Sequence, residues 1–155
     1  MKIRLFVLCL LLCCAVFAAD ETRKGWLKGP DKSWYIDYDL ALEAAKAQNK
    51  KVYVLRTGSD WCGFCIRLKK EVFASREFKQ YAKKNLILVY LDFPKRKKMP
   101  AEQKQYNNEI STKLKFGGAV PSAVILDSDG KEIGRVRGYA KLKIYMTRLQ
   151  DAVGK

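Results

Sequence analysis

Two cysteines separated by two residues, Cys62 and Cys65, are the residues of this chain best suited to carry out chemistry. They stand in Trp61-Cys62-Gly63-Phe64-Cys65, which follows an apolar segment and opens a segment with helical spacing. A thiol attacks a disulfide as its thiolate, and the free amide groups at the start of a helix stabilise a negative sulfur. The spacing therefore predicts a redox dithiol in which Cys62 is the exposed nucleophile and Cys65 is the more buried resolving thiol.

Residues 1–19 have the pattern of a signal peptide. Two basic residues, Lys2 and Arg4, precede an uncharged run that ends in small residues, and Ala18 or Ala19 marks the expected cleavage position. The run is shorter than the roughly 20 residues that cross a bilayer, which favours cleavage over an uncleaved anchor. An exported mature chain is therefore expected.

Removal of this leader changes the cysteine inventory. Cys9, Cys13 and Cys14 lie within it, so Cys62 and Cys65 are the only thiols of the mature chain. Such a chain has no framework of structural disulfides, and its cysteine chemistry is that of the pair. A lipoprotein with a lipidated Cys14 is an alternative, although the residues before this cysteine lack the small side chain expected at the cleavage site.

The sequence contains no histidine, which argues against two other uses of a cysteine pair, a zinc site and covalent haem attachment. A structural zinc site needs four Cys or His ligands, and the mature chain has two. Covalent haem attachment needs a histidine after the second cysteine, where Ile66 stands. We therefore expect no metal and no cofactor beyond a redox-active Cys62–Cys65 disulfide, with a purely structural short-range disulfide as the alternative.

The hydrophobic pattern predicts one α/β domain over residues 34–155, preceded by an extended polar lead-in at residues 20–33. Strand-like and helical segments alternate in the order β-α-β-α-β-α-β-β-α, with parallel strands in the first half and a late hairpin that adds an antiparallel edge. The expected fold is a three-layer α/β/α sandwich with a mixed central sheet. Strands are expected at 34–36, 51–57, 86–91, 123–126 and 131–136, and helices from Asp37 or Asp39 to 49, over 62–81 with a break at Ser75, and over 101–115 and 142–153.

Basic residues outnumber acidic ones by 31 to 16, and removal of Lys2 and Arg4 leaves 29 basic residues and a net charge of +13. Such a charge favours acidic partners, anionic lipids or cell-wall polymers, whereas its spread along the chain and the expected export argue against nucleic acid. One basic segment, residues 94–100, lies between two prolines. A solvated connection is the preferred interpretation of this segment, and a docking patch for an acidic partner or anionic lipid is the alternative.

Two separated motifs resemble the thioredoxin superfamily. Asp60-Trp61-Cys62-Gly63-Phe64-Cys65, at a strand-to-helix junction, is similar to the active site of that family, and Val120-Pro121-Ser122 resembles its cis-proline loop. With Leu91-Asp92-Phe93-Pro94, the motifs resemble exported bacterial thioredoxin-like proteins over most of the chain from Trp34 onward. The resemblance implies the thioredoxin fold and a periplasmic thiol–disulfide oxidoreductase. A monomer is the default expectation, because dimeric isomerases carry an added dimerisation domain and no segment here is long enough for one. The expected partners are protein or peptide disulfides and a membrane or periplasmic redox protein.

The resemblance also implies roles for residues around the pair. Pro121 would be cis and would lie against the cysteines, with an ordinary strand-entry proline as the alternative. Val120 would offer backbone groups to a substrate peptide in strand-like pairing. The small residues Gly118 and Ala119 would let the substrate backbone approach, unless the loop is simply flexible. Trp61 would pack beside the site and shield it, with a plain core aromatic as the alternative.

One departure from the family concerns the proton acceptor for the resolving thiol. Thioredoxins have a buried acid six positions before the first cysteine, and here that position is Arg56. An arginine is a poor base, so other carboxylates must be considered. Asp60, Glu71 and Asp92 are the candidates, although a surface or capping role is the preferred interpretation of each.

Other departures leave the redox direction open. Gly63-Phe64, which shapes the site between the cysteines, resembles disulfide isomerases rather than cytosolic thioredoxins with Gly-Pro. Val120 replaces the threonine that is common before the cis-proline of reducing members. The alternative functional class is a thioredoxin-like binding or chaperone module, with a structural disulfide and a basic docking surface.

Overall fold

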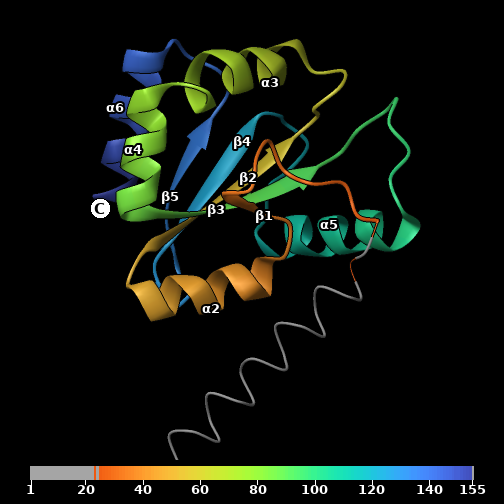
Figure 1. Cartoon of the computed structure of the whole chain (residues 1–155), viewed down its shortest axis with the longest axis horizontal. Helices are drawn as coiled ribbons and strands as arrows, with labels where there is room; N and C mark the ends of the chain where they lie inside the picture. The colour runs from red at the N-terminus through yellow and green to blue at the C-terminus, as the bar shows by residue number, and fades with distance from the viewer. Residues whose placement is uncertain (1–22, 24, 155) are drawn as a thin grey trace, which may run out of the picture.

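A five-stranded mixed sheet forms the middle layer of the molecule, with the strand order β1-β3-β2-β4-β5 (Figure 1). The computed structural model describes residues 23 and 25–154, so the predicted signal peptide lies outside it. β1 (Trp34–Tyr35), β3 (Leu86–Asp92) and β2 (Lys51–Thr57) are parallel. β4 (Ser122–Leu126) runs antiparallel to both β2 and β5 (Glu132–Arg137), which confirms the predicted hairpin at the edge.

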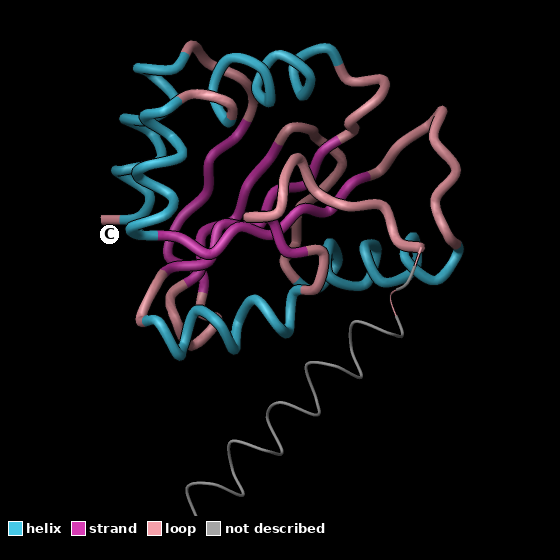
Figure 2. The backbone as a smooth tube through the Cα atoms, in the orientation of Figure 1, coloured by secondary structure: helices cyan, strands magenta, loops and turns pink. Residues whose placement is uncertain are grey.

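Helices cover both faces of this sheet, which confirms the expected three-layer arrangement (Figures 1 and 2). One face carries α2 (Tyr38–Gln48) and α5 (Ala101–Lys113). The other carries α3 (Gly63–Leu68), α4 (Arg76–Asn85) and α6 (Leu142–Val153). No helix in residues 25–154 is long and apolar enough to cross a membrane.

The central strand β2 has four consecutive buried apolar residues, 52–55, because it contributes to two cores. Tyr53 and Leu55 pack into the core beneath α3, α4 and α6, whereas Val52 and Val54 pack into the core above α2 and α5. Successive side chains of a strand point to opposite faces, so a strand covered on both sides is nearly continuously hydrophobic. β3 follows the same rule, and all seven of its residues are buried.

The strand pairing brings three chain segments together at one edge of the sheet. β2 and β3 are parallel with Thr57 opposite Asp92, so both strands end at this edge. β4 runs the other way with Ser122 opposite Arg56, so it begins there. The segments after β2, after β3 and before β4 therefore lie side by side, although they are far apart in the sequence.

Local side chains set the helix boundaries. Asp37, not Asp39, caps α2, because its carboxylate accepts the amides of Asp39 and Leu40. The helix expected from residue 62 breaks at Ser75, as predicted, because the Ser75 hydroxyl accepts the amide of Phe78 and so caps α4. The pattern did not predict that residues Lys69–Phe73, between α3 and this break, form a π-helical turn.

Part of the predicted polar lead-in is packed against the domain. Trp26 is buried, and its ring centroid lies 5.3 Å from that of Tyr106 on α5. The buried Gln103 side chain pairs with the backbone of Leu27, accepting its amide at 2.8 Å and donating to its carbonyl at 2.9 Å. This two-way pairing ties the segment to α5, so the packed structure begins before Trp34.

A buried hydrogen bond between Tyr53 and Tyr145 gives a test of this packing. The hydroxyls lie 2.5 Å apart and join β2, which leads into the cysteine pair, to α6. Tyr53→Phe or Tyr145→Phe leaves one buried hydroxyl without a partner, at a cost of about 1–3 kcal/mol in the free energy of unfolding. The double variant leaves no unpaired hydroxyl. We therefore expect its free energy of unfolding to fall by clearly less than the sum of the two single losses. Urea unfolding of the three variants measures this, and additive losses would contradict the buried pair.

Candidate active site

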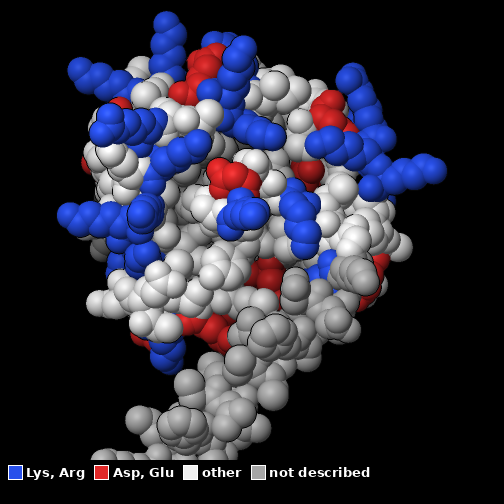
Figure 3. All heavy atoms as spheres, in the orientation of Figure 1, with Lys and Arg blue, Asp and Glu red and all other residues white. Residues whose placement is uncertain are grey.

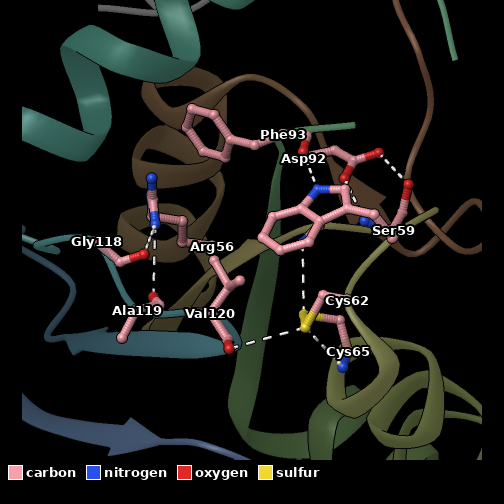
Figure 4. The surroundings of a disulfide bond; sticks show 11 residues. Arg56, Ser59, Cys62, Cys65, Asp92, Phe93, Gly118, Ala119 and Val120 are labelled. Carbon is pink, nitrogen blue, oxygen red and sulfur yellow. Dashed lines mark hydrogen bonds between the residues drawn. A yellow bond between two sulfur atoms is a disulfide. The ribbon is translucent and has the colours of Figure 1, made fainter. Parts of the chain in front are cut away.

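Cys62 and Cys65 form a disulfide at the start of α3, with their Cα atoms 5.2 Å apart (Figure 4). Cys62 is the N-cap residue, and its sulfur takes the place that a capping oxygen usually occupies. The amide of Cys65 donates to Cys62 Sγ at 3.2 Å, and the amide of Gly58 donates to Cys65 Sγ at 3.5 Å. Both sulfurs therefore lie where backbone amides favour negative charge.

The exposure of the pair differs from the expectation. Cys62 is 8% exposed and Cys65 4%, so in the disulfide form both cysteines are buried and the expected contrast is small. The exposed side chains are their neighbours, with Phe64 59% and Trp61 39% exposed. Gly63 also faces open space, because a Cβ there would meet no atom within 4 Å. The disulfide thus lies just beneath a surface formed by these three residues.

The loop before β4 faces the disulfide. The Val120–Pro121 peptide bond is cis, and the Val120 carbonyl oxygen lies 3.8 Å from Cys62 Sγ (Figure 4). The Pro121 carbonyl accepts the amide of Gly138, just after β5, at 2.9 Å. The two motifs that the sequence places 58 residues apart therefore meet through Cys62 and Val120.

Gly118 and Ala119 lie in the same loop, but their carbonyl groups point away from the sulfurs toward Arg56 (Figure 4). Arg56 Nη1 donates to the Gly118 oxygen at 3.1 Å and lies 3.5 Å from that of Ala119. The guanidinium also lies 4.5 Å from the ring centroid of Phe93. Arg56 therefore connects the loop after β3 to the loop before β4, a positioning role that sequence reasoning missed.

Burial lowers the pKa of the Arg56 guanidinium from its ordinary value. Its Nε is buried and has no hydrogen-bond partner among the described residues. The position that holds an acid in thioredoxins is thus occupied by a cation engaged with carbonyl groups.

The three candidate carboxylates are all engaged in other contacts. Asp92 accepts the amide of Ser59 at 2.9 Å and its hydroxyl at 2.5 Å (Figure 4). Asp60 accepts three successive amides of the loop after β3. Glu71 accepts hydrogen bonds from Arg67 and Tyr139. In residues 25–154 none of the three hydrogen-bonds to a cysteine sulfur, which agrees with the structural roles preferred for them.

Trp61 lies at the rim of the site rather than in the core, so the plain core interpretation is wrong. Its indole Nε1 donates to the Phe93 carbonyl at 2.7 Å, and Lys95 Nζ lies 4.1 Å from the ring centroid. Gly58 leaves room for the ring, since a Cβ at this position would come within 2.5 Å of it. The side chain therefore links the cysteine motif to the loop after β3.

Tyr139, after β5, is a residue of the site that sequence reasoning did not identify. Its ring stacks on Phe64 with centroids 6.0 Å apart and an interplanar angle of 15°, and Arg67 covers it at 4.5 Å. Its hydroxyl donates to Glu71, and the hydrogen bonds from Tyr139 and Arg67 lower the pKa of Glu71. The hydrogen bond to Glu71 raises the pKa of Tyr139, against the opposing effect of Arg67. The sequence signal for Tyr139 is limited to an aromatic residue that follows the last strand after one glycine, Gly138.

Comparisons with known proteins agree with this geometry. A family model described as a thioredoxin-like domain matches residues 38–152. The chain is 36% identical over 140 residues to a Chlamydia pneumoniae protein named disulfide bond reductase DsbH, covering 84% of this chain and 82% of that protein. A solved structure named DsbH oxidoreductase has a TM-score of 0.70 and 34% identity, covering 78% of this chain and 83% of the other. The thioredoxin-related protein DsbJ of Chlamydia pneumoniae is 28% identical over 68% of this chain, which spans 30% of that protein.

The hydrogen bonds of Asp60 predict how the loop after β3 responds to pH. Desolvation opposes ionisation of this carboxyl, but the amides of Lys95, Arg96 and Lys97 hold its pKa below the ordinary value. The ionised form therefore holds the loop at and above the ordinary Asp pKa of about 3.9. The contact is lost only as the pH falls through the lower pKa of the folded protein. We expect the three amide chemical shifts to stay constant from about pH 7 to pH 4 and to change together below that range.

Asp60→Asn is the control for this titration, because an amide side chain keeps the shape but does not ionise. Its loop amides should show no common acid transition. Separate midpoints for the three amides in the wild type, or a shared midpoint above the ordinary Asp value, would contradict anchoring by one carboxylate.

Proposed function

The chain belongs to the thioredoxin-like family of thiol–disulfide oxidoreductases, and we propose that it acts as a reductase of disulfide bonds in exported proteins. The observation that supports this most directly is the Cys62–Cys65 pair, which lies at a helix start and faces Val120 beside a cis-proline. The name of the Chlamydia pneumoniae relative favours reduction over oxidation or isomerisation.

In the proposed first step, the Cys62 thiolate of the reduced protein attacks one sulfur of a substrate disulfide. A bond forms between Cys62 Sγ and that sulfur, and the other substrate sulfur leaves as a thiolate that takes up a proton. The amide of Cys65, 3.2 Å from Cys62 Sγ, favours the attacking anion, as does the positive end of the α3 dipole.

In the second step, the Cys65 thiolate attacks Cys62 Sγ and releases the second substrate thiol. Two electrons have then passed to the substrate, and the protein holds the Cys62–Cys65 disulfide. A dithiol on a membrane or periplasmic redox partner restores the reduced pair by the reverse exchange. This scheme uses no metal and no cofactor beyond the dithiol.

The surface around Cys62 suits an extended peptide. The Val120 backbone borders the sulfur, so a substrate segment that pairs with it as a strand places its own disulfide beside Cys62. Gly118 leaves open space on this side, since a Cβ there would meet no atom within 4 Å. Phe64, which is exposed and stacked on Tyr139, adds an apolar border to this surface.

We further propose that the protein is exported and acts as a monomer. The pattern of residues 1–19 supports passage into a bacterial periplasm, where disulfide substrates occur and nucleic acid does not. The thioredoxin-like domain contains both cysteines and the cis-proline loop, so one copy of the chain supplies the whole proposed site and can act as a monomer.

Cysteine variants test the order of attack. Cys65→Ser keeps the proposed nucleophile but removes the resolving thiol, so we expect mixed disulfides through Cys62 to accumulate. Cys62→Ser should form few, because Cys62, and not Cys65, lies against the Val120 backbone at which the substrate is proposed to pair. Non-reducing gels and mass spectrometry of the trapped adducts measure this. Either substitution should lower insulin disulfide reduction at least about a hundredfold.

The reduction potential of the pair tests the direction. A reductase should lie closer to the value of thioredoxin, about −270 mV, than to that of the oxidant DsbA, about −120 mV. A potential near the second value would refute reduction as the main activity. Unchanged reductase activity in both cysteine variants would instead refute dithiol chemistry and favour the binding-module alternative.

Cell fractionation tests export. In a bacterium with a periplasm, we expect the mature chain in the periplasmic fraction, beginning at Ala19 or Asp20 after cleavage behind Ala18 or Ala19. A chain without residues 2–19 should stay in the cytoplasm. A membrane-bound chain that keeps Met1, or one lipidated at Cys14, would contradict simple cleavage.

A further inference from the structure

The loop between β3 and α5 carries four consecutive cations, and all four side chains are exposed. This basic loop comprises residues 94–100, with Lys95, Arg96, Lys97 and Lys98 between its two prolines. Figure 3 shows Lys and Arg side chains projecting from the part of the molecule where Figure 1 places this loop. They form one border of the sheet edge at which the cysteine pair lies.

The basic loop is fixed to the cysteine motif through its backbone. The Asp60 carboxylate accepts the amides of Lys95, Arg96 and Lys97 at 2.9, 2.8 and 2.7 Å. Three charge-assisted hydrogen bonds to one carboxylate hold the loop in one conformation. Because Asp60 binds the backbone, the cationic ends of the side chains stay available to solvent. The loop is exposed, as expected of the solvated connection preferred from the sequence, but its backbone is anchored by Asp60.

The fixed loop is also continuous with the rim of the disulfide. Asp60 stands two residues before Cys62, and Trp61 donates from its indole to Phe93 at the start of the loop. Lys95 Nζ lies over the Trp61 ring, 4.1 Å from its centroid. The first cation of the basic loop therefore lies at the edge of the surface that a substrate disulfide must approach.

The charges of the basic loop are only partly offset by nearby carboxylates, because Asp60 contributes one negative charge beside four positive ones and interacts electrostatically with Lys97. None of its four cations forms an ion pair within residues 25–154, whereas Lys46, Arg67 and Arg135 each pair with an acidic side chain. Glu102, in the first turn of α5, is the acidic residue that follows the loop in the chain. A fixed group of unpaired cations produces a local positive potential that attracts and orients acidic partners.

We propose that the basic loop is a docking site for acidic segments of substrate proteins. Such a segment lies next to the substrate disulfide that exchanges with the Cys62–Cys65 pair. This rests on the proposed reductase function and specifies which substrates that function prefers. A protein segment fits better than a membrane surface, because the loop shares its rim with the disulfide and a membrane seated there would cover the pair. The acidic segment lies along the loop while its disulfide reaches Cys62.

Two disulfide peptides with identical cores test the proposal, one flanked by aspartates and the other by lysines. Stopped-flow fluorescence follows their reduction by the reduced protein, starting at physiological ionic strength, where distant cations are screened. We expect the acidic peptide to react about tenfold faster or more, and the preference to fall as salt is added. The variant with Arg96→Gln, Lys97→Gln and Lys98→Gln should lose most of this preference. It keeps Lys95, so the contact with Trp61 remains.

A matched variant controls for net charge. Lys79→Gln, Lys83→Gln and Lys84→Gln remove the same charge from exposed positions of α4, which lies on the opposite side of the molecule from the loop (Figure 1). This variant should keep the preference for the acidic peptide. An equal loss of preference in both triple variants would overturn docking at the loop and assign the effect to overall charge.

Further measurements separate failure of docking from failure of the reductase function. Equal rates for both peptides in all proteins would overturn docking and leave reduction intact. The wild type could also reduce neither peptide. In that case, a binding assay with an acidic peptide whose cysteines are replaced by serines tests docking without reduction. Loop-dependent binding would then support docking while reduction fails. Loop-dependent binding to phosphatidylglycerol vesicles without peptide preference would assign the loop to membranes and overturn the proposal.

Discussion

The parallel pairing of β2 with β3 is the constraint on which the rest of the site depends. It sets Thr57 opposite Asp92, and the segments that leave these two residues carry the cysteine pair and the basic loop. The contacts between Asp92 and Ser59, and between Trp61 and Phe93, form only in this register. A shift by one residue would also turn every side chain of β2 to the wrong core. The same pattern that stabilises the sheet thus fixes the position of the disulfide.

Arg56 shows how a change at one position alters what the scaffold can do. It lies on β2 between the loops that follow β3 and precede β4, and its guanidinium contacts both. An acid there could exchange protons with the resolving thiol, whereas the arginine holds the Gly118 carbonyl and the Phe93 ring. The Cys65 sulfur accepts the Gly58 amide and no carboxylate hydrogen-bonds to it in residues 25–154. The Gly58 amide therefore provides the polar contact to this sulfur.

The sequence predicts most of the fold because each element depends on local patterns. β3 is recognisable from an unbroken apolar run, and the break at Ser75 from a capping residue. The cysteine pair is equally local. Local patterns do not predict the roles of Tyr139, Arg56 and Asp60, because these roles depend on which segments meet at the sheet edge. The pairing of Phe64 with Tyr139 joins residues 75 positions apart, and no spacing rule predicts it. The expectation of an exposed Cys62 failed for the same reason, since tertiary contacts of the loops decide its burial.

The position of the charges matters more for the proposed docking than their number. The chain carries a net charge of +15, but at physiological salt a charge acts over a Debye length of only about 8 Å. Cations on α4, which lies on the opposite side of the molecule from the basic loop, are therefore largely screened from a peptide beside that loop (Figure 1). Those of the basic loop are held near it by Asp60, an acidic residue whose carboxylate binds three backbone amides. Because the Asp60 carboxylate binds the loop backbone, the four positive side chains stay beside the disulfide. An unanchored loop of the same sequence would not hold them there.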